Sequence, residues 1–468
     1  MREARPKVHV SGIGGTAMVA GARLAIEAGW EVRGSDNPLY PPTSEMVEAL
    51  GVPVAQGYAP ENLDWNPDLV MIGNALSRGN AEVEAVLERG LRYVSLPEWL
   101  KEHVLRKRRP VAVCGTHGKT TTTALTAHVL DQCGLNPGFL IGGQPLNFTH
   151  SARLGPEGAP FVIEGDEYDT AFFDKRAKFF HYIPHIAIVT SIEFDHGDIY
   201  KDLAEIELAF QRMLRQIPRN GALILCADNH ALHLKGHAFS PVVTYGFAEG
   251  VEWRGEILGV AKGFQRMRVF HNDTPWAVIE SPMAGKHNLQ NALSAIAVAA
   301  WHGAAPEQVA GAVRTFKGVR RRMEVFLEAR GITFIDDFAH HPTAIRETIV
   351  AARMRWPGQR LRVLFEPRSN TTVTKQFQQD LEEAFVEADE VWLGPIHRAE
   401  RIPEDIRLDR AVLTAALSKR GISAQFSDSP EDIAKEVVRT AREGDIVLIL
   451  SNGAFGGIYN HFSTACAE

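Results

Sequence analysis

Short runs of apolar, often β-branched residues alternate along this chain with segments in which apolar residues recur at helical spacing. The apolar runs are 7–11, 112–114, 161–163, 187–191, 361–365 and 446–450. Such alternation is typical of parallel α/β sheets whose strands are connected by helices. Between 251 and 283, apolar and polar residues alternate singly around Gly and Asn-Asp turns, which predicts an added antiparallel meander.

Two basic segments mark the places where this pattern restarts. The first runs from Arg106 to Pro110 and separates a predicted helix over 97–105 from a new buried strand, so we place a boundary near Arg109. The second is 320–322, which follows predicted helices over 288–301 and 306–316 and precedes a strand over 333–336, so a boundary is placed near Arg321. The sequence therefore predicts three α/β domains: a Rossmann-like N-terminal domain (1–108), a central P-loop domain with the antiparallel addition (109–321) and a Rossmann-like C-terminal domain (322–468).

Composition and charge are those of an ordinary globular protein. The 468 residues carry 50 Lys and Arg against 57 Asp and Glu, a net charge of −7, so neither disorder nor a nucleic-acid partner is favoured. No apolar run approaches the roughly 20 residues that span a bilayer, and 1–12 lacks a signal-peptide core. We therefore expect a cytoplasmic protein without a membrane partner. Its four scattered cysteines indicate neither a disulfide framework nor a zinc site.

A glycine motif follows the first predicted strand. Gly12, Gly14 and Gly15, with Ala17, match the G-x-G-x-x-A turn that opens a helix and brings backbone N–H groups to a diphosphate. Asp36, at the end of the second predicted strand, stands where a carboxylate would bind a ribose hydroxyl. The motif fits a nicotinamide dinucleotide or a nucleotide-sugar. Glycines that serve only tight strand-to-helix packing are the structural alternative.

A second glycine loop lies between a strand over 111–114 and an apolar-periodic helix. Its glycines leave loop amides open to phosphate, Lys119 can reach terminal phosphates, and the Thr120 hydroxyl can ligate Mg²⁺. The loop departs from the G-x-x-x-x-G-K-[ST] spacing because Val113 occupies the first glycine position, and a coincidental Gly-Lys-Thr turn is the alternative. The nucleotide-binding residues predicted here are Gly115, Thr116, His117, Gly118, Lys119, Thr120 and Thr121.

Acidic residues follow two later strands. One segment runs from Glu164 to Glu167 and the other from Glu193 to His196. Because the carboxyl ends of parallel strands face the nucleotide in an open sheet, these carboxylates can hold Mg²⁺ and the imidazole can add a ligand. Either segment alone is more often a helix cap or a solvated turn. Both follow a phosphate loop, which favours a metal role.

The later motifs are individually weak, and their order indicates a family. Gly285 to Asn291 begins a helix, and Asp336 to Pro342 reads D-D-x-x-H-H-P. With the phosphate loop and the acidic strand ends, they resemble the Mur ligases, ATP-dependent enzymes that form amide bonds in peptidoglycan synthesis. The resemblance extends to Gly457 and implies ATP and Mg²⁺ as cofactors. It implies an ATP site completed by His287, Asn288, Asn291, Arg322 and Asp337, with Thr120, Glu164 and His196 as metal ligands.

The resemblance also implies a mechanism through an acyl phosphate. The γ-phosphate of ATP activates a carboxylate, because hydroxide is a poor leaving group, and the acceptor amine then attacks. Lys119 and two Mg²⁺ ions would neutralise charge during the phosphate transfer. Either His340 or Glu167 would accept the proton of the amine. The catalytic residues predicted in this way are Lys119, Glu164, His196 and His340.

Two branches of the family fit the sequence. Segments 9–15 and 337–342 resemble the branch that joins UDP-N-acetylmuramate to L-alanine. A second branch joins UDP-N-acetylmuramate to the tripeptide L-alanyl-γ-D-glutamyl-meso-diaminopimelate in peptidoglycan recycling. We favour this tripeptide branch, because more segments resemble it: 40–44, 73–80, 167–176, 366–370 and 451–457. Arg368 and Asn452 would contact the peptide, with an ordinary ion pair of Arg368 as the alternative. The substrate-binding residues predicted are Gly12, Gly14, Gly15, Asp36, Asn74, Arg368 and Asn452.

Some features depart from the family or favour other functions. Ser191 stands where the L-alanine branch commonly has Asn, and 202–215 contains no Lys, so a carbamylated lysine is not expected. A nicotinamide-dependent oxidoreductase built on the first glycine loop would leave the second loop unused. A non-catalytic nucleotide-sugar sensor would bind the nucleotide-sugar without releasing ADP. The sequence leaves the oligomeric state open.

Overall fold

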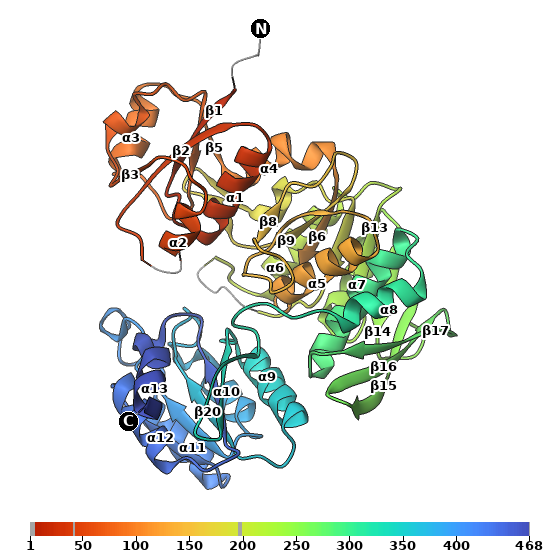
Figure 1. Ribbon diagram of the computed structural model, residues 1–468, viewed down its shortest axis with the longest axis vertical. Helices are drawn as coiled ribbons and strands as arrows, with labels where there is room; N and C mark the ends of the chain where they lie inside the picture. The colour runs from red at the N-terminus through yellow and green to blue at the C-terminus, as the bar shows by residue number, and fades with distance from the viewer. Residues whose placement is uncertain (1–4, 41–42, 195–198, 468) are drawn as a thin grey trace.

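Three β-sheets follow one another along the chain and form the frame of the molecule (Figure 1). The computed structural model describes residues 5–40, 43–194 and 199–467. The N-terminal sheet is wholly parallel, in the order β3-β2-β1-β4-β5. Its elements are β1 (Lys7–Ser11), α1 (Thr16–Glu27), β2 (Glu31–Asp36), α2 (Thr43–Glu48), β3 (Val54–Gln56), β4 (Leu69–Ile72), α3 (Ala81–Glu88), β5 (Tyr93–Ser95) and α4 (Leu96–His103).

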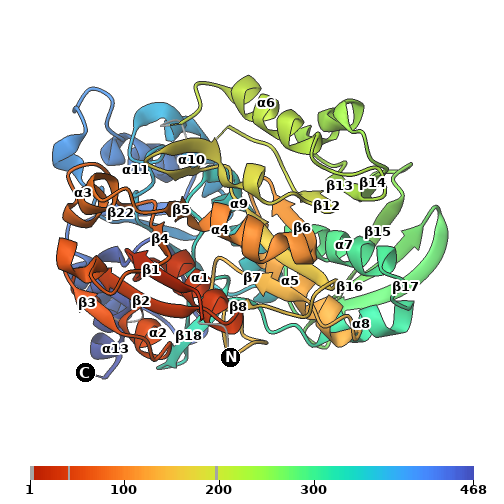
Figure 2. The ribbon, with the colours of Figure 1, turned by 90° about the horizontal axis from the view of Figure 1, so that it is seen from above.

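The middle sheet has ten strands in the order β17-β16-β15-β14-β13-β12-β6-β9-β7-β8. Helices α5 (Lys119–Gln132) and α7 (Lys286–Trp301) lie side by side against it (Figure 2). The strands are β6 (Arg109–Cys114), β7 (Gly138–Leu140), β8 (Ala152–Arg153), β9 (Pro160–Gly165), β12 (Ile186–Val189), β13 (Ala222–Cys226), β14 (Val242–Gly246), β15 (Trp253–Ala261), β16 (Phe264–His271) and β17 (Thr274–Ser281). Outside the sheet are the hairpin β10 (Asp169–Ala171) and β11 (Asp174–Ala177), and helices α6 (Leu203–Leu214) and α8 (Pro306–Arg314).

The C-terminal sheet has six strands in the order β18-β19-β23-β20-β21-β22, and only the pairing of β18 with β19 is antiparallel. Its strands are β18 (Glu324–Ala329), β19 (Ile332–Asp337), β20 (Leu361–Phe365), β21 (Glu390–Leu393), β22 (Ser423–Phe426) and β23 (Ile446–Leu450). Its helices are α9 (Pro342–Arg355), α10 (Gln378–Ala384), α11 (Arg410–Lys419), α12 (Pro430–Thr440) and α13 (Ile458–Ala467). Across the residues described, no helix is long and apolar enough to cross a bilayer.

The predicted α/β architecture is confirmed, and so are the parallel strands and the antiparallel meander β15–β17. The strand predicted over 187–191 was wrong at its end, because β12 stops at Val189. The N–H of Thr190 still donates to the carbonyl of Cys114 in β6, but the hydroxyls of Thr190 and Ser191 hydrogen-bond to the phosphate loop. The helix predicted over 97–105 ends at His103, and a separate 3₁₀ turn follows. The antiparallel edge strand β18 was not predicted.

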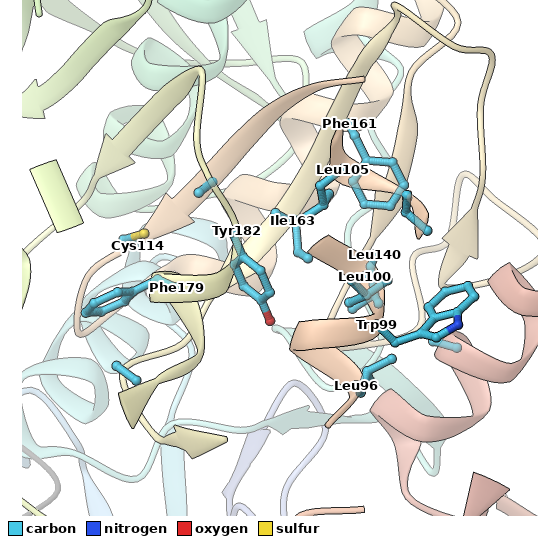
Figure 3. Packing of buried hydrophobic residues seen from close by; sticks show 14 of the residues in the cluster. Leu96, Trp99, Leu100, Leu105, Cys114, Leu140, Phe161, Ile163, Phe179 and Tyr182 are labelled. Carbon is cyan, nitrogen blue, oxygen red and sulfur yellow. The ribbon is translucent and has the colours of Figure 1, made fainter. Parts of the chain in front are cut away.

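One hydrophobic core continues from the N-terminal sheet into the middle sheet (Figure 3). Trp99 and Leu100 of α4 are 1% exposed and pack in the same cluster as Phe161 and Ile163 of β9. This apolar contact fixes the first glycine loop relative to the second. The two apolar clusters of the C-terminal sheet consist of residues beyond 322. The domain boundaries near 109 and 321 stay predictions.

Candidate active site

The phosphate loop follows β6 and leads into α5, and it has two glycines in left-handed backbone conformations. The φ angle is +124° at Gly115 and +79° at Gly118. A Cβ atom at Gly115 would lie 2.3 Å from Oγ1 of Thr190, and one at Gly118 would lie 2.8 Å from Oδ1 of Asn291. Both positions therefore require glycine, and the loop backbone packs closely against the end of β12 and against α7.

Residues that follow β12 hold this loop in place. The backbone N–H of Thr116 donates to the carbonyl of Ser191 at 2.9 Å. The N–H of His117 donates to Oγ of Ser191 at 3.0 Å, and Oγ1 of Thr190 donates to the carbonyl of His117 at 2.6 Å. Ser191 thus supports the loop through both its backbone and its hydroxyl.

Lys119 is paired with a buried carboxylate. Its Nζ lies 2.8 Å from Oε2 and 3.0 Å from Oε1 of Glu167, and it also donates to the carbonyl of Gly115 at 2.8 Å. Glu167 is 3% exposed. Burial opposes the charge of Lys119, but the carboxylates of Glu167 and Asp166 outweigh it and raise the pKa of Lys119. Lys119 therefore stays charged throughout the physiological pH range.

Thr120 and Glu164 offer oxygen ligands at the carboxyl end of the sheet. Oγ1 of Thr120 donates to Oε1 of Glu164 at 3.0 Å, and Oε2 accepts from the N–H of Gly142 at 3.1 Å. Burial raises the pKa of Glu164, and a bound cation would offset that cost. A hydroxyl and a carboxylate that converge in this way fit Mg²⁺, which prefers hard oxygen ligands. His196, the other predicted ligand, lies outside the described residues.

Glu193 connects the middle domain to the start of α9. Its Oε2 accepts a hydrogen bond from Oγ1 of Thr343 at 2.7 Å and lies 3.3 Å from Nε2 of His117. Nδ1 of His341 lies 3.9 Å from the same oxygen. Burial opposes ionisation, but the hydrogen bonds and nearby imidazoles lower the pKa of Glu193 to about 2. His341 and Thr343 were absent from the predicted site, because their contacts depend on how the domains pack.

A cavity of about 310 Å³ lies between α5, α7 and α9. Nδ2 of Asn288 donates to the carbonyl of Ala284 at 2.7 Å, and Nδ1 of His287 lies 3.6 Å from Oε2 of Glu347. Asp228 and Glu347 also line the cavity, although sequence reasoning missed both. Eight predicted ATP-site residues come together here: His117, Gly118, Thr121, His287, Asn288, Asn291, Arg322 and Asp337.

A larger cavity of about 1160 Å³ is lined by residues of all three domains. Thr16 and Met46 come from the N-terminal domain, whereas Tyr459 comes from α13. The predicted residues Thr116, His117, Gly118, Lys119, Thr120, Glu164, Arg322 and His340 line it as well. The cavity therefore lies between the phosphate loop and the N-terminal domain, which carries the first glycine loop. Nδ1 of His340 lies 3.0 Å from the carbonyl of Phe338, which orients the imidazole ring at the cavity.

Asp337 and Arg322 lie at the junction of the middle and C-terminal domains. Oδ2 of Asp337 accepts from the N–H of Met323 at 2.8 Å, and Oδ1 accepts from the N–H of Ala339 at 2.8 Å. The guanidinium of Arg322 lies 5.1 Å from the ring centre of Phe338. The Asp337 carboxylate therefore holds the backbone at the start of the C-terminal domain, next to the junction.

In the N-terminal domain, Asp36 closes the first glycine loop. Its Oδ2 accepts from the N–H of Gly14 at 2.7 Å, and its Oδ1 accepts from the hydroxyl of Tyr58 at 2.8 Å. A Cβ atom at Gly14 would lie 2.9 Å from Oδ2 of Asp36. Gly12 has φ +80°, and Gly15 forms the N-cap of α1. The structure therefore brings the four predicted residues together, and Asp36 contacts the loop itself.

Within the described residues, the remaining predicted substrate residues make no hydrogen bond to the phosphate loop. Nδ2 of Asn74 donates to the carbonyl of Asp169 at 3.1 Å, which ties the N-terminal domain to the β10–β11 hairpin. Nη1 of Arg368 lies 3.4 Å from Oε1 of Glu366 and 3.3 Å from Nδ1 of His397. Oδ1 of Asn452 is buried without a hydrogen-bond partner in the described part of the chain. Neither Arg368 nor Asn452 lines either cavity.

Comparison with known proteins identifies the family. The model of the Mur ligase family catalytic domain matches residues 7–108, that of the Mur ligase middle domain 113–299, and that of the Mur ligase glutamate ligase domain 321–453. The chain belongs to the Mur ligase family. As a Mur ligase it is an ATP-dependent enzyme that forms amide bonds.

Relatives of this Mur ligase include members of both branches. An Escherichia coli protein named UDP-N-acetylmuramate–L-alanyl-γ-D-glutamyl-meso-2,6-diaminoheptandioate ligase is 42% identical, over 99% of this chain and 98% of its own. A murein peptide ligase from Psychrobacter arcticus has a crystal structure that matches with a TM-score of 0.74 and 38% identity, over 99% of both chains. A UDP-N-acetylmuramate–L-alanine ligase from Paracidovorax citrulli is 33% identical, over 98% of this chain and 96% of its own.

Proposed function

We propose that this Mur ligase joins UDP-N-acetylmuramate to the preformed tripeptide L-alanyl-γ-D-glutamyl-meso-diaminopimelate in the cytoplasm, in peptidoglycan recycling. The observation that carries the proposal is the 42% identity, over nearly the full length, to a relative named for this tripeptide, against 33% to a relative named for L-alanine. The UDP-sugar binds at Gly12, Gly14 and Gly15, because this loop presents backbone amides at the start of α1.

The reaction begins at the phosphate loop. A carboxylate oxygen of the muramoyl group attacks the γ-phosphorus of ATP, ADP leaves, and an acyl phosphate forms. Any phosphate that binds in the loop competes with Glu167 for the ammonium of Lys119, which then stabilises the charge of the transferring group. Thr120 and Glu164 would hold Mg²⁺, and His196 is the proposed ligand of a second ion. Bound Mg²⁺ neutralises charge on the phosphates.

The second half of the reaction takes place in the larger cavity. The α-amine of the tripeptide attacks the acyl carbon, inorganic phosphate leaves, and the amine loses a proton. His340 and Glu167 are the two proposed acceptors, since both lie beside the phosphate loop or its cavity. Arg368 and Asn452 are proposed to hold the peptide beyond the cavity rim. Gly453 lines the cavity, follows Asn452 in the chain and packs against the side chain of Arg368.

Product analysis tests this function. The protein is incubated with ATP, Mg²⁺, UDP-N-acetylmuramate and the tripeptide, and products are identified by mass spectrometry. The expected result is UDP-N-acetylmuramoyl-tripeptide together with one ADP per amide bond. In parallel incubations, a product that forms only when L-alanine replaces the tripeptide would assign the chain to the L-alanine branch, and reduction of an added nicotinamide cofactor would revive the oxidoreductase alternative.

A further inference from the structure

A fully buried carboxylate lies behind the first glycine loop. Glu82, in the first turn of α3, is 0% exposed. Its Oε2 accepts hydrogen bonds from the hydroxyls of Ser11 and Ser35, each at 2.6 Å. Its Oε1 accepts from Nδ2 of Asn62 at 2.5 Å. A buried ion is costly unless its oxygens are satisfied, and here three neutral donors satisfy it.

Two further features stabilise the negative charge of Glu82. Nε2 of the buried His9 lies 3.4 Å from Oε2. The carboxylate also lies at the N-terminal end of α3, whose N-cap residue Asn80 accepts from the N–H of Glu82 at 3.0 Å. Burial opposes ionisation, but hydrogen bonds from His9, Ser11, Ser35 and Asn62 outweigh it and lower the pKa of Glu82. The side chain is therefore ionised at neutral pH.

The residues that contact Glu82 adjoin the glycine loop. Ser11 immediately precedes Gly12, and Ser35 immediately precedes Asp36. The carbonyl of Ser35 accepts from the N–H of Gly12 at 2.9 Å, and Asp36 accepts from the N–H of Gly14. The carboxylate thus fixes the ends of β1 and β2, which hold the glycine loop in place.

Asn62 extends the same network to Tyr58. Besides Glu82, its Nδ2 contacts the carbonyl of Gly57 at 3.0 Å. The N–H of Gly57 donates to the carbonyl of Asp36 at 2.7 Å, and the hydroxyl of Tyr58 donates to the Asp36 carboxylate at 2.8 Å. One buried carboxylate therefore sets both the loop backbone and the orientation of Asp36.

We propose that Glu82 is a positioning residue for the UDP-sugar, which it never touches: it holds the Gly12–Gly14 amides and Asp36 in the geometry that binds the nucleotide diphosphate. The inference rests on the proposed function only for the identity of that ligand. If the buried carboxylate served stability alone, its removal would not weaken binding of the UDP-sugar more than binding of ATP.

The test compares Glu82→Gln with Glu84→Gln. Glu84 lies on the same helix, where it pairs with Arg78 at the surface, so it is a matched control. The KM values for UDP-N-acetylmuramate and for ATP are measured well below the melting temperature. We expect Glu82→Gln to raise the KM for the UDP-sugar at least tenfold and to leave the KM for ATP within twofold. Glu84→Gln should match the wild type in both.

A folded Glu82→Gln variant with an unchanged KM for the UDP-sugar, or with equal increases in both KM values, would overturn the inference. If that variant does not fold, Ser11→Ala removes one hydrogen bond and leaves the charge satisfied by the other donors. It should raise the same KM severalfold, and an unchanged value would again refute the role. If wild type and Glu84→Gln both fail to ligate UDP-N-acetylmuramate, the proposed function fails instead.

Discussion

The ammonium of Lys119 lies 2.8 Å from Oε2 of Glu167, so the lysine of the phosphate loop is paired with a carboxylate that is almost completely buried. Glu167 follows β9 and Lys119 begins α5, and β9 and β6 are neighbours in the sheet. The pair therefore results directly from the parallel strand order. A phosphate bound in the loop must draw the ammonium away from Glu167 or share it.

Replacement of Lys119 by Ala should nearly abolish ligation. The variant loses the cation that stabilises the transferring phosphate, an effect of about 3–4 kcal/mol, or roughly 10²–10³ in kcat. ADP release in the presence of all substrates measures kcat, and circular dichroism checks that the fold is intact. Turnover within threefold of the wild type would refute the ATP-site assignment.

The hydrogen bond from Thr343 to Glu193 should help to hold the C-terminal domain against the ATP cavity. Hydrogen bonds to charged groups contribute about 1.5–3 kcal/mol. Thr343→Val should therefore raise the KM for ATP and increase the radius of gyration in small-angle X-ray scattering. Thr343→Ser keeps the hydroxyl and is the control. Equal scattering and KM for the Val and Ser variants would show that the contact does not hold the domains together.

Arg368 should determine affinity for the peptide and not for the UDP-sugar. If its guanidinium binds a carboxylate of the tripeptide, Arg368→Ala raises the KM for the tripeptide by about 10–100-fold and leaves that for UDP-N-acetylmuramate nearly unchanged. Arg368→Lys retains the charge without the bidentate geometry, so its KM for the tripeptide should lie between those of the wild type and Arg368→Ala. An unchanged KM for the tripeptide would leave Arg368 as the partner of Glu366 alone.

Glu82 should make stability depend on pH in acid. Its folded-state pKa is lowered, whereas an unfolded Glu has a pKa of about 4.3. The stabilisation is therefore complete above the unfolded pKa and is lost as the pH falls through the folded one. Melting temperatures of wild type and Glu82→Gln should differ by a constant amount near neutral pH and converge below about pH 4. A difference that grows as the pH falls would contradict this sign.

The sequence predicted the strands and the phosphate loop because their signals are local. A run such as 446–450 is apolar because the strand is buried on both faces, and the phosphate loop is a run of consecutive residues, Gly115 to Thr121, that leads into α5. The contact of Glu193 with Thr343 could not be predicted in the same way, since these residues are 150 positions apart and meet only when two domains pack.

Glu82 illustrates a second limit. A Glu in the first turn of a short helix is usually solvated, and its charge interacts favourably with the helix dipole. Nothing in the sequence indicates that hydroxyls from two strands will contact Glu82. The end of β12 was missed for a similar reason. Thr190 and Ser191 are compatible with a strand, but their hydroxyls bind the phosphate loop.

The choice of acceptor is the central claim, and a comparison of the two acceptors tests it most directly. With saturating ATP and UDP-N-acetylmuramate, kcat/KM is measured from ADP release with L-alanine and with L-alanyl-γ-D-glutamyl-meso-diaminopimelate. We expect the tripeptide to be preferred by at least 100-fold, a difference of about 2.7 kcal/mol. A preference for L-alanine would contradict the account and place this Mur ligase in the L-alanine branch.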